Sequence, residues 1–424
     1  MNIIMMTNTY KPILGGLEKS VEAFTLEYRK RGHRVIIIAP VLEGMTEEED
    51  VIRVPALQHV NGTDFSAPLP IPGALTEALG DFRPDIVHAN HPFWIGDTAL
   101  RLAEKHNVPL VFTHHTLYEQ NTHYVPGGDS EAMKRFVIQL STGYANLADQ
   151  VFAPSGSIKK LIEERGVTTP VEVVPTGIDL KRFAGADPKK IRERLEISPQ
   201  KFVVGHLGRL APEKNLEFLT KAVIIFLRKN LEAHFLLVGK GPSEDEIKKL
   251  FLEAGLADRL HLAGVLSGQD LVDAYHAMDV FVFASQSETQ GLVLTEAMAS
   301  GVPVVGVDAP GVREVILNKL NGRLLLDENL NDFSSAIEWV AKRTSKERQE
   351  MKTVCLKTAE SFSMEKSVTH ALKIYTSIRK GDEFVRRKSD DSSWAETGRM
   401  IHAHWELTKN LTKATAEAIL GSEK

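Results

Sequence analysis

Short apolar runs rich in β-branched residues alternate with amphipathic segments of helix length along most of the chain, which limits the folds open to it. Such runs, separated by helices and flanked by glycine, proline and polar residues, are typical of parallel sheets built from βαβ units. The pattern breaks at the turn-rich stretch 174–188 and then starts again. The predicted strands are Asn2–Met6, Val35–Ala39, Ile86–Ala89, Leu110–Thr113, Gln150–Ala153 and Val171–Val174 before the break, and Phe202–His206, His234–Val238, Leu260–Leu262, Val280–Phe283 and Val304–Val307 after it. We therefore predict an α/β protein with two doubly wound, Rossmann-like domains facing a shared cleft, for which 424 residues suffice.

The segment boundaries follow from the same pattern. We expect domains at 1–180 and 181–362, a helix over 363–380 that returns to the first domain, and a charged linker with a C-terminal helix over 381–424. Six residues of that last helix fall roughly on one face: Met400, His404, Leu407, Leu411, Ala414 and Ala418. Packing on the body of the protein or on a second subunit is the favoured interpretation, with a membrane-surface helix as the alternative.

Charge and cysteine content exclude several classes of protein. The formal net charge is −5, so broad attraction to nucleic acid or to an anionic membrane is not expected. The single cysteine, Cys355, excludes an internal disulfide and is typical of a reducing compartment. The N-terminal MNIIMMTNTY has the pattern of a strand, and no apolar run approaches the ~18 residues of a membrane span. We expect a cytoplasmic protein; peripheral contact with the inner face of the membrane and homo-oligomerisation both stay open.

The stretch SETQGLVLTEAMASG places two carboxylates, Glu288 and Glu296, around the start of a predicted helix. Gly291 allows close approach of a ligand to the backbone, and the helix that begins near Leu292 presents N–H groups typical of a phosphate site. Carboxylates beside a phosphate site suit sugar and ribose hydroxyls, so the pattern predicts a nucleotide sugar. Two alternatives are a helix-entry residue followed by a solvated helix residue, and a glycosidase carboxylate pair.

A second stretch, HLGRLAPEKNLEFL, supports the same ligand. Arg209 and Lys214 follow a predicted strand, with Pro212 placed to start a helix. An arginine fork and a lysine point charge suit a diphosphate. Two solvated surface cations are the alternative, which their position at a strand end in the same domain as Glu288 disfavours.

Together, GRLAPEKN and SETQGLVLTEAMASGVPVV resemble the retaining family-4 glycosyltransferases of GT-B fold, over about residues 1–380. The resemblance implies that Arg209 and Lys214 grip the donor diphosphate and that Glu288 contacts the transferred sugar. It further implies that Glu296 holds the ribose hydroxyls. Backbone N–H groups of the helix start would bind phosphate and sugar, from Gly291, Leu292 and Val293. The segment GKGPSEDEIKKL resembles the one beside the nucleobase, and by itself it also predicts a capping box between Ser243 and Glu246.

The resemblance extends to the N-terminal half, which would bind the acceptor. YKPILGGLEKSV resembles the family's glycine loop, with Gly15 and Gly16 near the phosphates. His115 matches the family's active-site histidine, which contacts the donor sugar. HANHPFWIG departs from the commoner His-Ala-His form, because Asn90 stands at the second histidine and leaves the role of His91 in doubt. HTLYEQNTHYVP resembles the branch that glucosylates diacylglycerol, and its acceptor-side residues would be Tyr118, Glu119, His123 and Tyr124.

No metal or other cofactor is expected. Six of the fifteen histidines fall between His88 and His123, but they form no ligand motif, and the chain has no Asp-x-Asp. Arg209, Lys214 and the helix dipole would neutralise the leaving diphosphate instead of a divalent ion. Four other functions stay open: a nucleotide-sugar epimerase, a pyridoxal-dependent phosphorylase, a two-Rossmann oxidoreductase disfavoured by the absence of GxGxxG after the first strand, and a non-catalytic sugar-nucleotide-binding protein.

Overall fold

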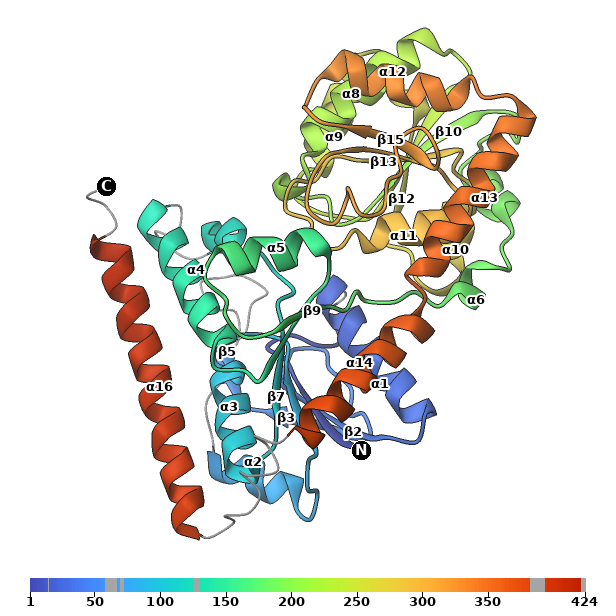
Figure 1. Ribbon diagram of the computed structural model, residues 1–424. Coiled ribbons are helices and arrows are strands. Elements are labelled where there is room, and N and C mark those ends of the chain that lie inside the picture. The colour runs from blue at the N-terminus through green and yellow to red at the C-terminus, as the bar shows by residue number, and fades with distance from the viewer. Residues whose placement is uncertain (14, 58–66, 69–71, 125–129, 382–392, 421–424) are drawn as a thin grey trace. The chain divides into compact units, whose positions relative to one another are not determined.

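The structure, a computed structural model, describes residues 1–13, 15–57, 67–68, 72–124, 130–381 and 393–420. The chain folds into two units, residues 1–177 with 364–424 and residues 178–363 (Figure 1). Each unit is an α/β layer structure around its own parallel sheet, as the alternation of apolar runs and amphipathic segments predicts.

The first unit is built on a seven-stranded parallel sheet in the order β3-β2-β1-β6-β7-β8-β9. Its strands are β1 (Asn2–Met6), β2 (Arg34–Pro40), β3 (Val51–Val54), β6 (Ile86–Ala89), β7 (Leu110–Thr113), β8 (Gln150–Ala153) and β9 (Val171–Val173); β4 (Ala56–Leu57) and β5 (Ala67–Pro68) form a separate antiparallel pair. Its helices are α1 (Gly16–Lys30), α2 (Pro72–Leu79), α3 (Ile95–His106), the 3₁₀ helix η2 (Tyr118–Tyr124), α4 (Glu131–Ala145), α5 (Gly156–Glu164), α14 (Met364–Lys380) and α16 (Ser393–Leu420).

Both faces of this sheet are buried. Ile4 and Met6 of β1 face the core formed with α2, α3, α4 and α5, whereas Ile3 and Met5 face the core formed with α1 and α14. Strands buried on both faces read as continuous apolar runs, which explains why the sequence pattern locates them well. The hydroxyl of Tyr375 ties α14 into the unit, since it lies 3.2 Å from the Tyr28 hydroxyl and 2.5 Å from Nδ1 of His88.

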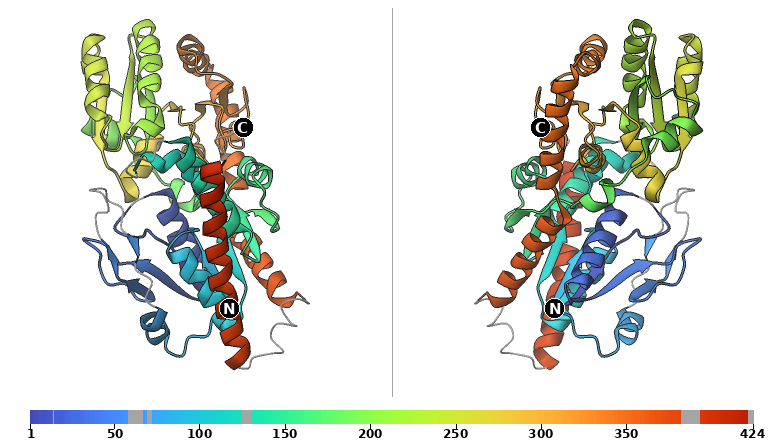
Figure 2. Two further views of the ribbon diagram at one scale, coloured as in Figure 1. Left: turned by 90° about the vertical axis from the view of Figure 1, so that its left-hand side faces the viewer. Right: turned by 90° about the vertical axis from the view of Figure 1, so that its right-hand side faces the viewer.

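The C-terminal helix α16 packs antiparallel on α4 and also contacts α3 (Figure 2, left). Asn410 Nδ2 donates to the Leu140 carbonyl at 3.0 Å, and Gly143 allows this approach, because a Cβ there would lie 1.7 Å from Asn410 Oδ1. Ala403 and Ala414 of α16 are buried against the first unit, whereas His404 and Leu411 of the predicted face are exposed. The other four residues of the predicted face, Met400, Leu407, Ala414 and Ala418, are buried or partly buried, and Leu407 packs against the core of the first unit.

The second unit has a six-stranded parallel sheet in the order β12-β11-β10-β13-β14-β15. Its strands are β10 (Phe202–Leu207), β11 (Ala233–Val238), β12 (Leu260–Gly264), β13 (Val280–Phe283), β14 (Val304–Val307) and β15 (Gly322–Leu325). Its helices are α6 (Leu180–Phe183), α7 (Pro188–Arg194), η3 (Pro212–Lys214), α8 (Leu216–Lys229), α9 (Glu244–Glu253), η4 (Ala257–Arg259), α10 (Gly268–His276), α11 (Leu292–Ala299), α12 (Leu330–Ala341) and α13 (Ser345–Ser361).

The order in which successive strands are added changes side at one place in each sheet, between β1 and β6 in the first unit and between β10 and β13 in the second. In open parallel sheets, ligands bind outside the carboxyl ends of the strands at such a switch point. The loops after these four strands are therefore where functional side chains are expected.

Candidate functional site

In the second unit, the loop between β13 and α11 carries Glu288 and ends at Gly291. Gly291 is the N-cap of α11 with φ 77°, and Glu288 Oε1 accepts a hydrogen bond from its N–H at 3.1 Å. Leu292 and Val293 are the first two residues of the helix, so their N–H groups have no acceptor within it. The sequence thus places the loop and the helix start correctly, and the structure adds that Glu288 holds the N–H of Gly291 just before the helix.

Two glycine turns interlock at this helix start. Gly311 also has a left-handed φ, of 79°, and a Cβ there would lie 2.5 Å from the backbone nitrogen of Gln290. A Cβ at Gly291 would lie 2.9 Å from the Gly311 carbonyl oxygen. Only glycine fits at either position, which fixes the backbone that presents the first N–H groups of α11.

The loop after β10 brings a cation to Glu288. Lys214 is the last residue of η3, and its Nζ lies 3.6 Å from Glu288 Oε2, with both side chains about four-fifths buried. Ser285 Oγ donates to the Glu213 carbonyl at 3.1 Å and so links the loop after β13 to the loop after β10. Arg209 lies in the same loop after β10 and is exposed. The cation and the carboxylate that the sequence singles out are therefore neighbours at the switch point.

Glu296 lies inside α11 and is 5% exposed. Its Oε2 accepts a hydrogen bond from the Tyr275 hydroxyl at 2.7 Å, and this carboxylate raises the pKa of Tyr275 in addition to the larger effect of burial. Tyr275 lies on α10, and no pattern in the sequence predicts its hydrogen bond to Glu296. The ribose-binding role of Glu296 stays a prediction.

The predicted capping box at α9 is wrong. Ser243 is the N-cap, but its backbone is helical (φ −84°, ψ 0°) and its side chain makes no capping hydrogen bond. A capping side chain needs an extended backbone at this position. The Ser243 N–H instead donates to the Leu210 carbonyl at 2.8 Å, which joins this segment to the Arg209 loop.

In the first unit, Gly15 and Gly16 stand at the start of α1, as the glycine-loop resemblance implies. Gly15 is the N-cap in extended conformation, and a Cβ on it would overlap the carboxylate of Glu18, which is 8% exposed. A carboxylate therefore already lies beside the positive end of this helix. From the side on which a Gly15 Cβ would lie, a phosphate could approach only if the Glu18 side chain moved.

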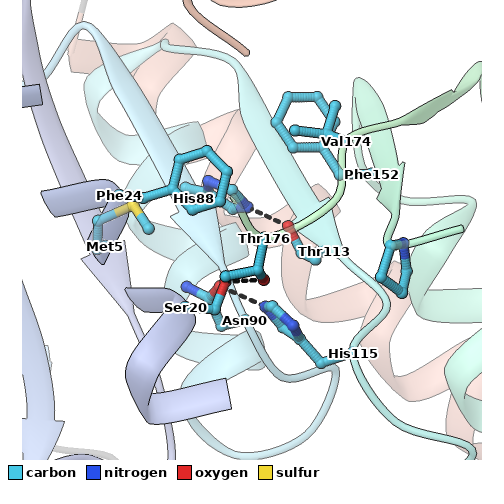
Figure 3. Close-up of a pocket in the computed structure, with 11 residues that line it drawn as sticks. Met5, Ser20, Phe24, His88, Asn90, Thr113, His115, Phe152, Val174 and Thr176 are labelled. Carbon is cyan, nitrogen blue, oxygen red and sulfur yellow. Dashed lines mark hydrogen bonds between the residues drawn. The ribbon is translucent and has the colours of Figure 1, made fainter. Parts of the chain in front are cut away.

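A small pocket opens at the switch point of the first unit, with a volume of about 10 Å³, roughly the space of one water molecule. Figure 3 shows His115 and Asn90 pointing toward each other in it, with Thr176 and Ser20 joined by a hydrogen bond of 2.7 Å. The pocket is lined by Met5, Ser20, Phe24, His88, Asn90, Thr113, His115, Phe152, Pro154, Val174 and Thr176. His115 therefore lies just after the carboxyl end of β7, beside the switch point of this sheet.

The histidines around this pocket are neutral. Burial lowers the pKa of His88 and His91 to about 3, and that of His114 to about 4. Burial and the three neighbouring imidazoles hold the pKa of His115 well below its usual range. His91 Nδ1 accepts from the Asn8 N–H at 3.1 Å, so this histidine fixes the loop after β1.

The acceptor-side residues of the first unit lie on η2. The Tyr118 ring packs against Phe93, with 5.0 Å between ring centroids, and Glu119 forms an ion pair of 2.6 Å with Arg165 at the end of α5. The side chains of His123 and Tyr124 lie outside the part of the chain that the structure describes. Acceptor contacts by these four residues stay predictions.

His206 was not singled out by the sequence. It is the last residue but one of β10 and is 1% exposed, its Nδ1 lies 2.9 Å from the Val282 carbonyl oxygen, and burial lowers its pKa to about 4. Among the residues that the structure describes, no cluster of three or more His, Cys, Asp or Glu side chains could hold a metal ion. Within the same ranges, every helix lacks the combination of length and apolar character that spanning a membrane requires.

Two sequence profiles cover most of the chain. The profile of Glycosyltransferase Family 4 matches residues 14–182, and that of Glycosyl transferases group 1 matches residues 187–354. The chain is a family-4 glycosyltransferase. The C-terminal segment with α16 lies beyond both matches.

Named relatives agree with this membership. The transferase is 28% identical over 346 residues to alpha-monoglucosyldiacylglycerol synthase of Streptococcus pneumoniae, covering 80% of this chain and 77% of the relative. It is 27% identical over 356 residues to a GDP-mannose-dependent alpha-mannosyltransferase of Corynebacterium glutamicum, covering 80% of each. Nothing in these matches supports an epimerase, a phosphorylase, an oxidoreductase or a non-catalytic protein.

The fold is shared with solved structures. The crystal structure of Anabaena HepE in complex with UDP matches with a TM-score of 0.69 at 20% identity, covering 89% of this chain and 100% of that chain. The transferase therefore has the two-domain GT-B fold predicted from its sequence.

Proposed function

We propose that the transferase moves a hexose from a nucleotide sugar to an acceptor hydroxyl of a glycolipid or lipid, with retention of anomeric configuration. The observation that carries the proposal is the group formed by Lys214, Glu288 and the Gly291 turn at the switch point of the second unit. It combines a cation for a diphosphate, a carboxylate for sugar hydroxyls and a helix start for phosphate oxygens.

The contacts of Glu288 suggest how a donor would bind. Glu288 neutralises Lys214 and accepts a hydrogen bond from the Gly291 N–H. A diphosphate carries more negative charge than one carboxylate, so it would take over Lys214 and the N–H groups of α11. Glu288 would then be released toward the hydroxyls of the transferred sugar, with Arg209 contributing a second cation.

Retention is most simply explained by attack on the same face of the sugar from which the diphosphate leaves. The departing β-phosphate would take the acceptor proton, and Arg209, Lys214 and the α11 dipole would stabilise the developing charge without a divalent ion. His115 would lie near the sugar from the first unit. Glu296 would hold the ribose, and the acceptor would contact η2.

The lipid acceptor is supported by the diacylglycerol named in the streptococcal relative, and the mannosyltransferase relative leaves the donor open between UDP-glucose and GDP-mannose. We further propose a cytoplasmic location with peripheral contact at the inner face of the membrane. Cell fractionation tests this, since a peripheral protein is released from membranes by high salt or alkaline washing.

The test of function is a donor-by-acceptor screen that measures released nucleoside diphosphate. UDP-glucose, UDP-galactose, UDP-N-acetylglucosamine and GDP-mannose are each supplied with diacylglycerol micelles, with simple sugars, or alone, and with or without EDTA. Release that requires lipid and survives EDTA is the expected result. Release only with soluble sugars would refute the lipid acceptor, and release abolished by EDTA would refute the metal-independent mechanism. Inversion at the anomeric carbon of the product would refute retention.

A further inference from the structure

The outward face of α16 carries large apolar side chains. Ile401 is 66% exposed, Trp405 64% and Leu411 50%, whereas Ala403 and Ala414 on the opposite side are buried against the first unit. The left view of Figure 2 looks onto this outer side, with the first unit behind it. The helix thus turns small residues inward and large apolar ones outward, which is typical of a surface that contacts another body.

The exposed apolar side chains follow one line along the helix. At about 100° per residue, residues spaced alternately by four and three positions stay within about 40° of this line. The six residues that do so, which we call the α16 strip, are Ile401, Trp405, Thr408, Thr412, Thr415 and Ile419. The strip extends over about 27 Å and contains no charged residue.

The threonines of the strip keep their hydroxyl hydrogens within the helix. Thr408, Thr412 and Thr415 each donate a hydrogen bond of 2.9 Å from Oγ1 to the carbonyl oxygen four residues earlier. A buried donor without an acceptor costs free energy, so these internally matched hydroxyls allow the strip to leave water at little cost.

The edge of the strip that carries Lys409 and Lys413 is basic. Both lysines are exposed and lie about 80–120° round the helix from the strip. Glu406, which pairs with Lys409 at 3.5 Å, lies further round the helix, and its side chain is 23% exposed. An apolar strip bordered by lysines matches the interface of a bilayer, where acyl chains lie beside phosphate groups.

A second copy of the chain matches this charge pattern less well. The strip is centred at residue 410, so antiparallel pairing of two strips would set Lys409 beside the same lysine of the other copy. Parallel pairing would set the lysines against the edge that carries Met400 and Leu411, which holds no acidic residue. Like charges in contact are unfavourable, whereas lipid phosphates would neutralise both lysines.

We propose that the α16 strip docks on a phospholipid bilayer, with Ile401 and Trp405 among the acyl chains and the two lysines of the basic edge at the lipid phosphates. This inference rests on the proposed function for its lipid acceptor, and it names the surface through which the membrane contact occurs. Helix α16 contacts α4, and α4 contacts η2, which carries the predicted acceptor-side residues. Docking would therefore hold the acceptor side of the first unit near the membrane that supplies the lipid.

The experiment measures sedimentation of the full chain with vesicles in the absence of nucleotide sugar. Vesicles of phosphatidylcholine alone are compared with vesicles that also contain phosphatidylglycerol. The wild type is expected to bind both, and the anionic vesicles more tightly. A variant that combines Ile401→Ser and Trp405→Ser is expected to bind both kinds at least about tenfold more weakly, because it loses the free energy of transferring two apolar side chains from water.

Two further variants separate charge from apolar contact. Combining Lys409→Gln and Lys413→Gln should weaken binding to anionic vesicles about fivefold per lysine and leave binding to neutral vesicles almost unchanged. Combining Leu231→Ser and Leu252→Ser is the matched control, because these leucines are 74% and 70% exposed and belong to the second unit. The control should bind vesicles as the wild type does, and the urea midpoints of all variants should match that of the wild type, because every substituted side chain is exposed.

Light scattering without lipid tests a second copy as the occupant of the strip. A wild type that binds no vesicles but forms a dimer, which the Ile401→Ser and Trp405→Ser variant dissociates, would overturn the proposal. Equal vesicle binding by the wild type and this variant would also overturn it. Because the vesicle assay needs no transfer, a chain that binds vesicles through the strip but transfers no hexose would refute the proposed function and support the docking surface.

Discussion

Replacing Glu288 by glutamine or by alanine separates the structural from the chemical use of its carboxylate. Glutamine keeps an oxygen that can accept from the Gly291 N–H but removes the charge that faces Lys214, whereas alanine removes both. A hydrogen bond in a loop contributes about 0.5–1.5 kcal/mol, and a partly exposed ion pair contributes up to about 1 kcal/mol. Glu288→Ala should thus lower the free energy of unfolding by about 0.5–2.5 kcal/mol, and Glu288→Gln by less than about 1 kcal/mol.

The loss of kcat/KM for transfer should not follow the order of these losses in stability. Hydrogen bonds to a charged group contribute about 1.5–3 kcal/mol, and about 1.4 kcal/mol corresponds to a tenfold change in rate. Both variants should therefore lose roughly 10- to 100-fold or more in kcat/KM, although glutamine leaves the fold almost unchanged.

The assay combines urea unfolding with release of nucleoside diphosphate in the presence of acceptor. Glu328→Gln is the matched control, because this nearby carboxylate accepts hydrogen bonds from Asn215 and Gln286 and belongs to neither site motif. A Glu288→Gln variant with the kcat/KM of the wild type would refute the reasoning. So would a loss of activity that matches the unfolded fraction.

Three further predictions test other parts of the site. Lys214→Ala should lower kcat/KM for transfer by at least about tenfold and weaken binding of nucleoside diphosphate in calorimetry, while Lys214→Arg should recover part of the loss. Gly311→Ala should destabilise the second unit by more than about 1–2 kcal/mol in urea unfolding, because its φ is left-handed and the new Cβ would meet the Gln290 backbone; unchanged stability would contradict this. Three buried histidines stay neutral in the folded chain but take up protons when unfolded, so stability should fall below about pH 6.5. These three alone contribute up to about 4 kcal/mol per pH unit, and the urea midpoint at about pH 5.5 should lie well below that at about pH 7.5. These residues are His88, His114 and His206.

The central strands were predictable because both faces of each sheet are buried, which leaves an apolar run in the sequence. The edge strands β3 and β15 were missed for the converse reason. They are only partly buried and contain Arg53 and Arg323, so neither forms an apolar run.

The candidate site likewise has parts that the sequence predicts and parts that it does not. Loop residues next to a helix start could be located, because Gly291 and Pro212 leave a local signal. Contacts between distant segments could not, because no local pattern encodes them. The hydrogen bond that Tyr275 donates to Glu296 and the one that Asn90 donates to the Met6 carbonyl both depend on the folded sheet.

Helix α14 makes the first unit discontinuous in sequence, since residues 364–380 complete a structure that began at residue 1. During synthesis at roughly 5–20 residues per second, residues 178–363 are added in roughly 10–40 s, and only then does α14 follow. Throughout that interval the surface that will receive Val368, Ala371 and Tyr375 is bare, and by its end the whole second unit has been synthesised. On the ribosome, the unit that emerges first is therefore the one finished last, and a chain cut after the second unit would leave a chaperone-binding apolar groove where α14 belongs.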